Sequence, residues 1–308
     1  MCSRTEGLTL SQFKPYTDEE LLAACARARR NIVDMTYKAQ SGHPGGSLSS
    51  VEILAALYLR VMRHDPQNPH WPDRDRFVIS KAHASPVLYA FLAEAGYIPQ
   101  AELATYRAIN SRLQGHPKLG TAPGIEISGG SLGQGLSFCI GQCLAARLDK
   151  RDYRCYCLLG DGELDEGQCW EAAMSATHHN IANLTAIIDR NHIQNDGYGD
   201  YERALEYSHP VPGGWVRPDG HTINIMNLEP LADKWRAFGW RVQEVDGHNV
   251  FAVIEALERS KGSLDGPSLI IAHTIKGKGV SYMENNPAFH GKAPNKEEYE
   301  KALVELGA

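Results

Sequence analysis

The sequence predicts an α/β fold in which a parallel β-sheet carries helices on both of its faces. First, apolar runs of strand length alternate with segments of helical periodicity, the pattern of helix-covered parallel sheets. Second, the apolar runs at 153–159 and 184–189 are separated by a helical crossover long enough to make the two strands parallel. Third, 43% of the 308 residues are hydrophobic and 22% are charged, which indicates a globular protein with a large core.

Composition also limits the class of function. The chain has 31 basic and 37 acidic residues and no run of like charge, so a nucleic-acid partner is not expected. No apolar stretch approaches the 18 residues of a membrane span, and residues 1–13 carry no secretory signal, so no membrane is expected. The seven cysteines form no C-x-x-C pair and are interpreted as buried free thiols of a reducing, cytoplasmic environment.

The N-terminal elements are marked by caps and breaks. Thr17 and Glu20 form a capping box that opens a long helix reaching about Gln40. Residues 41–46 are rich in Gly and Pro and are predicted to interrupt the helical structure, and a second helix is expected from about Ser50. A short strand at 76–80 and a helix that begins at Pro86 complete this half.

The remaining elements follow a glycine-dense loop at 129–135. The predicted helices cover 138–148, 166–178 and 251–260, and the predicted strands cover 153–159, 184–189, 241–245 and 268–273. Asn249 is a candidate N-cap of the helix at 251–260. Because no linker divides the chain, residues 1–308 are predicted to form a single domain.

Two oxygen-bearing side chains follow neighbouring strands of this sheet. Asp161 ends the first strand of the strand–helix–strand unit, and Asn191 lies just beyond the second. Ligands of open parallel sheets bind beyond the carboxyl ends of the strands, so both side chains are expected in one crevice. A carboxylate, an amide oxygen and a backbone carbonyl after Asn191 suit Mg²⁺ or Ca²⁺. Gly162 would let a phosphate approach the backbone, and the following helix would offer its N-terminal N–H groups.

A dinucleotide-binding fold is the main rival interpretation. Gly160, Gly162 and Gly167 do not match G-x-G-x-x-G, because their last gap is too long. Asp161 would also face a pyrophosphate directly, and two negative charges about 4 Å apart repel by ~4 kcal/mol at an effective dielectric near 20. A divalent cation removes this conflict, so the sequence favours a diphosphate bridged by a metal ion.

These residues belong to a set of motifs that resembles the transketolases. Gly160-Asp161-Gly162 with Asn191 is similar to the thiamine diphosphate motif of that family. Further similar blocks occur in order along nearly the whole chain, at 41–46, 81–84, 115–117, 129–135, 274–279 and 290–291. The resemblance implies a thiamine-diphosphate-binding fold, so that residues 1–308 would be the diphosphate-binding domain of transketolase type.

The resemblance also implies roles for individual residues. Asp161 and Asn191 would bind the metal through their side chains and Ile193 through its carbonyl, with Mg²⁺, Ca²⁺ or Mn²⁺ as the ion. Asn191 would thereby also hold the cofactor. The other implied cofactor contacts are Gly162, His83 and Lys276 at the diphosphate and Gly130 and Leu132 at the thiamine rings. The implied catalytic residues are His43, His116 and His290 in the substrate funnel and Glu166, at an interface that links two active sites.

Each of these residues also has a structural interpretation. A lone histidine is more often a cap or a core hydrogen-bonding group than a catalyst. Lys276 could be a solvated surface charge, and Glu166 could be a first-turn carboxylate favoured by the helix dipole. Ser131 stands where many full-length transketolases have proline, which bears on the loop beside the thiamine rings.

The resemblance implies only half of an active site. Single-chain transketolases are about twice this length, and the half absent here carries the glutamate that acts on the aminopyrimidine ring. The chain is therefore expected to be the N-terminal subunit of a split transketolase, in an α₂β₂ heterotetramer with a separate C-terminal subunit. It would transfer a two-carbon ketol unit between sugar phosphates, as in pentose phosphate metabolism. The alternatives are a 1-deoxyxylulose-phosphate-synthase-like enzyme, a 2-oxoacid dehydrogenase α-type subunit, or a non-catalytic binding or scaffold subunit.

Overall fold

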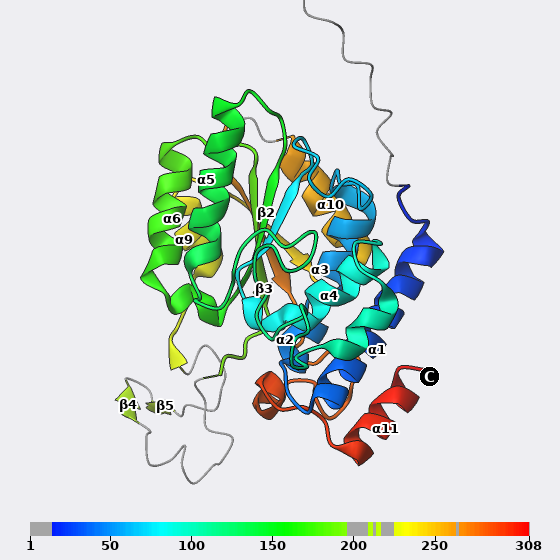
Figure 1. Cartoon of the computed structure of the whole chain (residues 1–308). Helices are drawn as coiled ribbons and strands as arrows, with labels where there is room; N and C mark the ends of the chain where they lie inside the picture. The colour runs from blue at the N-terminus through cyan, green and yellow to red at the C-terminus, as the bar shows by residue number, and fades with distance from the viewer. Residues whose placement is uncertain (1–13, 196–208, 212–213, 217–224, 263–264, 308) are drawn as a thin grey trace, which may run out of the picture.

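A five-stranded parallel sheet forms the centre of the computed structural model, which describes residues 14–195, 209–211, 214–216, 225–262 and 265–307 (Figure 1). Its strand order is β1-β2-β3-β7-β6, and every neighbouring pair is parallel. The strands are β1 Arg76–Ile79, β2 Cys155–Gly160, β3 Leu184–Arg190, β6 Arg241–Asp246 and β7 Ser268–His273. Two further short strands, β4 His209–Val211 and β5 Gly214–Val216, pair with each other as a separate antiparallel hairpin.

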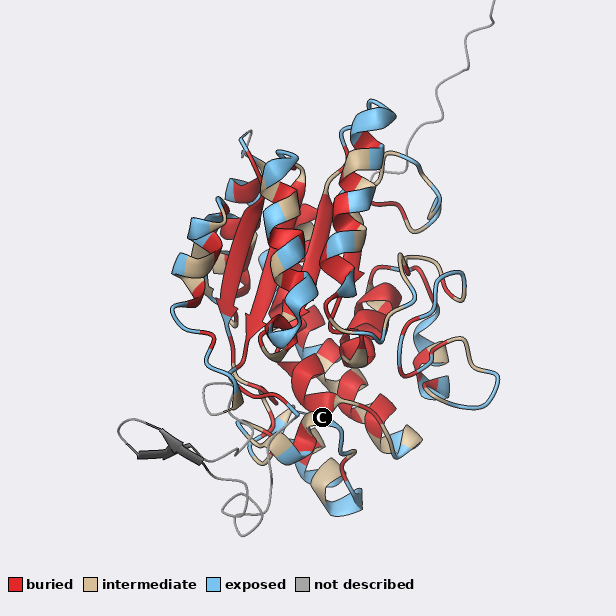
Figure 2. Cartoon of the chain, turned by 90° about the vertical axis from the view of Figure 1, so that its left-hand side faces the viewer, coloured by how far each residue is buried: buried red, intermediate tan, exposed pale blue. Residues whose placement is uncertain are grey.

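Helices cover both faces of the sheet, as the sequence predicted (Figure 1). One face packs against α1 Asp18–Ala39, α3 Val51–Ala56, α4 Ser85–Glu94 and α10 Val250–Lys261, with α11 Lys296–Glu305 in the same core cluster. The other face packs against α5 Gln134–Leu148, α6 Gly167–His178 and α9 Leu231–Ala237. Side chains of β2 alternate between these two cores: Leu158 enters the first and Leu159 the second. Figure 2 shows the strands buried between the two helical layers.

Most predicted boundaries hold within a few residues. Thr17 and Glu20 form the expected capping box of α1, and Gln40 ends that helix in the left-handed conformation. Asn249 caps α10 by accepting hydrogen bonds from two backbone N–H groups. Helix α5 begins four residues before the predicted Phe138, because Gly133 adopts a positive φ of 83° and turns the chain into the helix there. The six cysteines in the described part are buried free thiols, as expected.

The glycine- and proline-rich segment at 41–46 is not simply an interruption. It contains the start of a short helix, α2 Pro44–Leu48, whose first residue is the proline. Gly45 is required there because an added Cβ would come within 2.8 Å of the Phe289 carbonyl oxygen. The predicted second helix then forms as α3 and continues into a π-helical turn at Leu57–Val61.

The strand order places a crevice at the carboxyl ends of β2, β3 and β7. The chain runs outward from β1 to β3, reaches β6 at the far edge, and returns to β7 beside β3. Ligands of open parallel sheets bind where the strand order reverses, here between β3 and β7. Gly160 lies opposite Asp189, and Asp189 lies opposite Ala272, so the residues after these strands meet at one edge. Among the described residues, no helix is both long and apolar enough to span a membrane.

Candidate functional site

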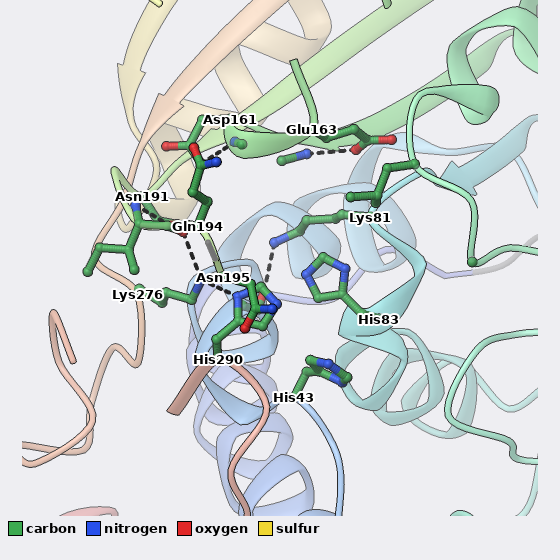
Figure 3. A pocket seen from close by; sticks show the side chains of 16 residues that line it. His43, Lys81, His83, Asp161, Glu163, Asn191, Gln194, Asn195, Lys276 and His290 are labelled. Carbon is green, nitrogen blue, oxygen red and sulfur yellow. Dashed lines mark hydrogen bonds between the residues drawn. The ribbon is translucent and has the colours of Figure 1, made fainter. Parts of the chain in front are cut away.

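A cavity of about 280 Å³ lies at this edge of the sheet (Figure 3). Most of the predicted site residues line it: His43, His83, Gly130, Leu132, Asp161, Gly162, Asn191, Ile193, Lys276 and His290. They come from separate stretches of the chain, which the sheet and its connections bring together. In Figure 3, Asp161 and Asn191 lie toward one end of the cavity, and the histidines lie toward the other.

The first end of the cavity presents the three predicted metal ligands. Asp161 is 2% exposed, and its two oxygens accept hydrogen bonds from the backbone N–H groups of Gly162, at 2.8 Å, and His192, at 2.6 Å. Burial raises the pKa of Asp161, even though the Arg190 guanidinium lies 3.2 Å from its carboxylate. A bound cation would oppose that effect of burial and favour the ionised form of Asp161.

The donor set fits a divalent cation that also binds a diphosphate. It comprises the Asp161 carboxylate, the Asn191 amide oxygen and the Ile193 carbonyl, which are the hard oxygen ligands that Mg²⁺ and Ca²⁺ prefer. Within the described ranges, no three His, Cys, Asp or Glu side chains form a group that could hold a metal. The ion would therefore need further oxygens, and the phosphates of a bound cofactor can supply them.

Gly162 has the close packing expected of a residue beside the diphosphate. A Cβ atom at Gly162 would lie 2.6 Å from the Cβ atom of Gln194, so no larger residue fits without displacing that segment. The helix predicted at 166–178 forms as α6, but it does not directly follow Gly162. A 3₁₀ turn, Gly162–Asp165, follows, and α6 begins only at Gly167. The nearest backbone N–H groups are thus those of the 3₁₀ turn.

Lys276 joins the two ends of the cavity. Its Nζ atom donates to the Ile193 carbonyl at 2.8 Å and lies 2.7 Å from Nδ1 of His290 (Figure 3). Lys276 is 2% exposed, so it is not the solvated surface charge of the alternative interpretation. Burial lowers the pKa of Lys276 to about 8, which leaves the amine mainly protonated at neutral pH. Its position suits the charge of an anionic cofactor.

The opposite end of the cavity is formed by a cluster of histidine rings. The ring centroid of His43 lies 5.2 Å from that of His83 and 5.4 Å from that of His290, and the His83 and His290 centroids are 4.9 Å apart. Burial, with help from the charge on Lys276, lowers the pKa of His290 to about 2. Burial and the neighbouring His116 lower the pKa of His43 to about 4. These rings are therefore neutral at pH 7.

One atom of this cluster has an unused hydrogen-bonding capacity. The His43 Nδ1 atom is buried and has no hydrogen-bond partner in the described part of the chain. A buried polar group without a partner is costly, so a hydroxyl or amine from a bound molecule would satisfy it. This end of the cavity thus suits a polar ligand such as a polyol.

The remaining two predicted site residues lie outside the cavity. The side chain of His116 is exposed, and its ring centroid is 6.4 Å from that of His43, so it stands next to the histidine cluster. Glu166 precedes α6 with an exposed side chain that makes no capping hydrogen bond. It lies beside the glycine loop, because a Cβ atom at Gly133 would come within 2.9 Å of the Cβ atom of Glu166.

Three buried charged residues escaped the sequence prediction: Lys81 and Glu163, which line the cavity, and Asp189, which lies behind it. The side chains of Lys81 and Asp189 form an ion pair, and both residues are almost fully buried. The Glu163 carboxylate accepts hydrogen bonds from the Ser80 hydroxyl and from the backbone N–H groups of Gly133, at 2.9 Å, and Gly160, at 3.0 Å. The signal that could have identified them is their closeness to motif residues. Lys81 belongs to the block at 81–84, Glu163 follows Gly162, and Asp189 precedes Asn191 by two residues.

Comparison with known proteins agrees with this geometry. Residues 22–208 and 215–308 match the family described as "Transketolase, thiamine diphosphate binding domain". The chain is 44% identical to the 6-deoxy-6-sulfo-D-fructose transketolase subunit SqwG of Clostridium sp. (strain MSTE9), over 90% of this chain and 93% of that protein. It is 40% identical to an apulose-4-phosphate transketolase subunit of Phocaeicola vulgatus, over 94% of each chain.

A solved structure gives the same result for the fold. The transketolase of Campylobacter jejuni superimposes with a TM-score of 0.82 at 33% identity, over 95% of this chain. The match covers 43% of that longer chain, so this chain spans less than half of the solved transketolase and nearly all of the subunit-type relatives. The comparisons favour neither a 2-oxoacid dehydrogenase α-type subunit nor a scaffold subunit. The predicted fold and the predicted thiamine diphosphate cofactor are confirmed, and this chain belongs to the transketolase family.

Proposed function

We propose that this chain is the N-terminal, thiamine-diphosphate-binding subunit of a two-subunit transketolase. It would transfer a two-carbon ketol unit from a ketose phosphate to an aldose phosphate. The observation that carries this proposal is the single cavity with metal-ligand oxygens at one end and neutral histidines at the other. The first end suits a diphosphate with its cation, and the second suits the hydroxyl groups of a sugar.

The roles of the individual residues follow from their places around the cavity. Asp161, Asn191 and the Ile193 carbonyl would hold Mg²⁺, or Ca²⁺ or Mn²⁺ in its place. The proposed diphosphate contacts are Gly162, His83 and Lys276, and the proposed neighbours of the thiamine rings are Gly130 and Leu132. The cofactor supplies the nucleophilic carbon and the electron sink that cleavage beside a carbonyl requires.

The protein's own groups would bind the sugar and move protons. His43 and His290 are neutral at pH 7. His43 Nδ1, which has no partner in the described part of the chain, can accept a hydrogen bond or a proton from a sugar hydroxyl. His290, whose Nδ1 atom lies 2.7 Å from the Lys276 amine, can donate its Nε2 proton to a sugar oxygen. The protonated Lys276 amine, next to His290, would stabilise negative charge that develops on a substrate oxygen. His116 stands beside the cluster and is proposed to contact the outer part of the sugar.

The proposed partner is a separate C-terminal transketolase subunit. Two relatives that match this chain over 90% or more of both lengths are named as subunits, which supports a second polypeptide at the active site. The exposed Glu166 beside the glycine loop is available for an interface that links two sites. We place the assembly in the cytoplasm as an α₂β₂ heterotetramer, in which residues 1–308 of each copy of this chain form a single diphosphate-binding domain. Relatives differ in their named sugars, so pentose phosphate metabolism is one candidate pathway among several.

Reconstitution tests this proposal. The purified chain, its purified C-terminal partner and their mixture would be assayed with Mg²⁺, thiamine diphosphate and a ketose phosphate plus an aldose phosphate. We expect ketol transfer from the mixture and almost none from either polypeptide by itself. Full activity of this chain in isolation would contradict the shared site. Turnover of 2-oxoacids in place of sugar phosphates would contradict the transketolase assignment.

A further inference from the structure

The buried Asp189 carboxylate accepts hydrogen bonds from several side chains. Its Oδ2 atom accepts from the Ser49 hydroxyl at 2.6 Å, from the Asn191 amide at 2.8 Å and from the Lys81 amine. The Ser50 hydroxyl lies at 3.4 Å from the same atom, and the Thr274 hydroxyl donates to Oδ1. Asp189 is 0% exposed, so its carboxylate is bound by protein groups and does not face solvent.

The donors to Asp189 come from four of the segments near the diphosphate end of the cavity. Ser49 follows α2, Lys81 follows β1, Asn191 follows β3, and Thr274 follows β7. The Lys81 amine also donates to the Gly46 carbonyl at 2.7 Å, which ties α2 to the same group. One carboxylate therefore links four segments at this end of the cavity.

The bond between Asp189 and Asn191 decides which atom of the Asn191 amide is available as a ligand. An asparagine side chain can present either its oxygen or its NH₂ group, and only the oxygen binds a cation. Because Nδ2 of Asn191 donates to Asp189, its Oδ1 atom points the other way, where it accepts from the Ile193 N–H at 3.2 Å. Loss of the acceptor at Asp189 would let the amide turn its NH₂ group toward the cavity.

We infer that Asp189 is a positioning residue for the divalent cation: it fixes the Asn191 amide with its oxygen toward the metal. This inference rests on the proposed role of Asn191 as a metal ligand. Asp189 would not touch the cation itself, but it would control how tightly the cation is bound. Outer partners of metal ligands typically change metal affinity by about 10- to 100-fold when they are removed.

The first test compares two double variants of the full chain. In both, Lys81→Met removes the buried positive charge, so that neither variant leaves an unpaired ion. Asp189→Asn keeps an oxygen that can accept from Asn191, whereas Asp189→Leu removes it. Binding of Mn²⁺ is measured by electron paramagnetic resonance of the free ion in the presence of thiamine diphosphate, with a protein-free blank. We expect K81M/D189L to bind Mn²⁺ about 10- to 100-fold more weakly than K81M/D189N.

A second pair of variants, with smaller changes in the core, provides a test if K81M/D189L does not fold. Thr274→Val removes a donor to Asp189 with little change of shape. Thr185→Val is its matched control, because that buried threonine lies on the same strand as Asp189 but bonds to Ser260, at 3.0 Å. We expect T274V to weaken Mn²⁺ binding by about 3- to 10-fold, as for one lost hydrogen bond, and T185V to leave it unchanged.

The outcomes separate this inference from the proposed function. If the wild-type chain retains no Mn²⁺ with thiamine diphosphate, the proposed metal site fails, and the role of Asp189 fails with it. If the wild-type chain binds Mn²⁺ but K81M/D189L equals K81M/D189N, or T274V equals T185V, only the positioning role is overturned. Thermal unfolding of all four variants identifies losses that come from unfolding.

Discussion

The Nζ atom of Lys276 lies 2.7 Å from Nδ1 of His290, inside the cavity that holds the candidate site. A protonated lysine amine can only donate hydrogen bonds, so Nδ1 of His290 must be the acceptor. The proton of the neutral His290 ring is therefore on Nε2. Lys276 thus sets which edge of His290 offers a proton to a bound ligand.

This relationship predicts an observable tautomer. In ¹⁵N-histidine-labelled protein at pH 7, we expect the His290 signals to report a neutral ring protonated at Nε2. Lys276→Met removes both the donor and a nearby positive charge, so the pKa of His290 should rise from about 2 toward its ordinary value. An Nδ1-protonated ring in the wild-type chain, or an unchanged His290 pKa in K276M, would show that the pair does not act in this way.

Substitutions at the two ends of the cavity should affect different steps. His290→Ala is expected to slow ketol transfer about 10²- to 10⁴-fold in the reconstituted enzyme, because it removes a group proposed to move protons. It should leave thiamine diphosphate affinity nearly unchanged. Asp161→Ala removes the carboxylate proposed to hold the cation, and we expect cofactor affinity to fall more than about 100-fold.

Isothermal titration of thiamine diphosphate in the presence of Mg²⁺ measures this contrast. His70→Ala, at an exposed position outside the cavity, serves as the control for both variants. Equal losses of affinity in H290A and D161A would argue against separate roles for the two ends.

Acid should destabilise the chain through the histidine cluster. The folded-state pKa of His43 is about 4, below the ordinary value near 6.5, so the unfolded chain takes up a proton first as the pH falls. The stability associated with neutral His43 is therefore complete above pH ~6.5 and is lost progressively as the pH falls toward 4. Between pH 7 and pH 5, we expect protonation linked to His43 alone to lower the free energy of unfolding by about 1–2 kcal/mol, allowing for its partial exposure.

Urea unfolding at pH 7 and pH 5 measures that loss. The loss should be about 1–2 kcal/mol smaller in His43→Asn than in the wild-type chain. His70→Asn, at an exposed position, should match the wild type. If H43N loses as much stability on acidification as the wild type, His43 is not held neutral by the fold.

The buried carboxylate of Glu163 should hold the glycine loop in place. Glu163 accepts from the Gly133 and Gly160 N–H groups, and Glu163→Gln turns one accepting oxygen into a donor. Hydrogen bonds to a charged group contribute about 1.5–3 kcal/mol each, so we expect the unfolding free energy to fall by about 2–3 kcal/mol. The Gly133 amide should also exchange its hydrogen faster. Glu171→Gln, at an exposed position on α6, is the control, and equal stability of the two variants would refute this role.

Much of the architecture could be predicted because it depends on local patterns. Apolar runs of strand length fixed the positions of β2 and β3, and the length of the crossover between them required parallel pairing. That pairing alone was enough to bring Asp161 and Asn191 to one edge of the sheet. The short helix α2 was missed, because its glycines are poor helix formers, and their close packing against other segments is invisible in the sequence.

The buried charges at the site could not be predicted from local patterns. Lys81 and Asp189 are 108 residues apart, and each alone reads as an ordinary polar residue beside a strand. Their pairing depends on the positions of β1 and β3 on either side of β2, which is a property of the whole sheet. For the same reason, the sequence could not show that Lys276 is buried or that His116 and Glu166 remain exposed.

The register of β2 against β3 determines where the chain tolerates changes of length. Gly160 pairs with Asp189 across the two strands, and the segment at 179–183 enters β3 from the edge opposite the cavity. Residues inserted at 179–180, the exposed start of that segment, would lie on the surface far from the ligand groups, whereas Ile181 is buried in the core. A single residue deleted within β3 would reverse the direction of every later side chain of the strand. Homologous chains are therefore expected to vary in length before Leu184 and to keep a constant spacing from Leu184 to Asn191.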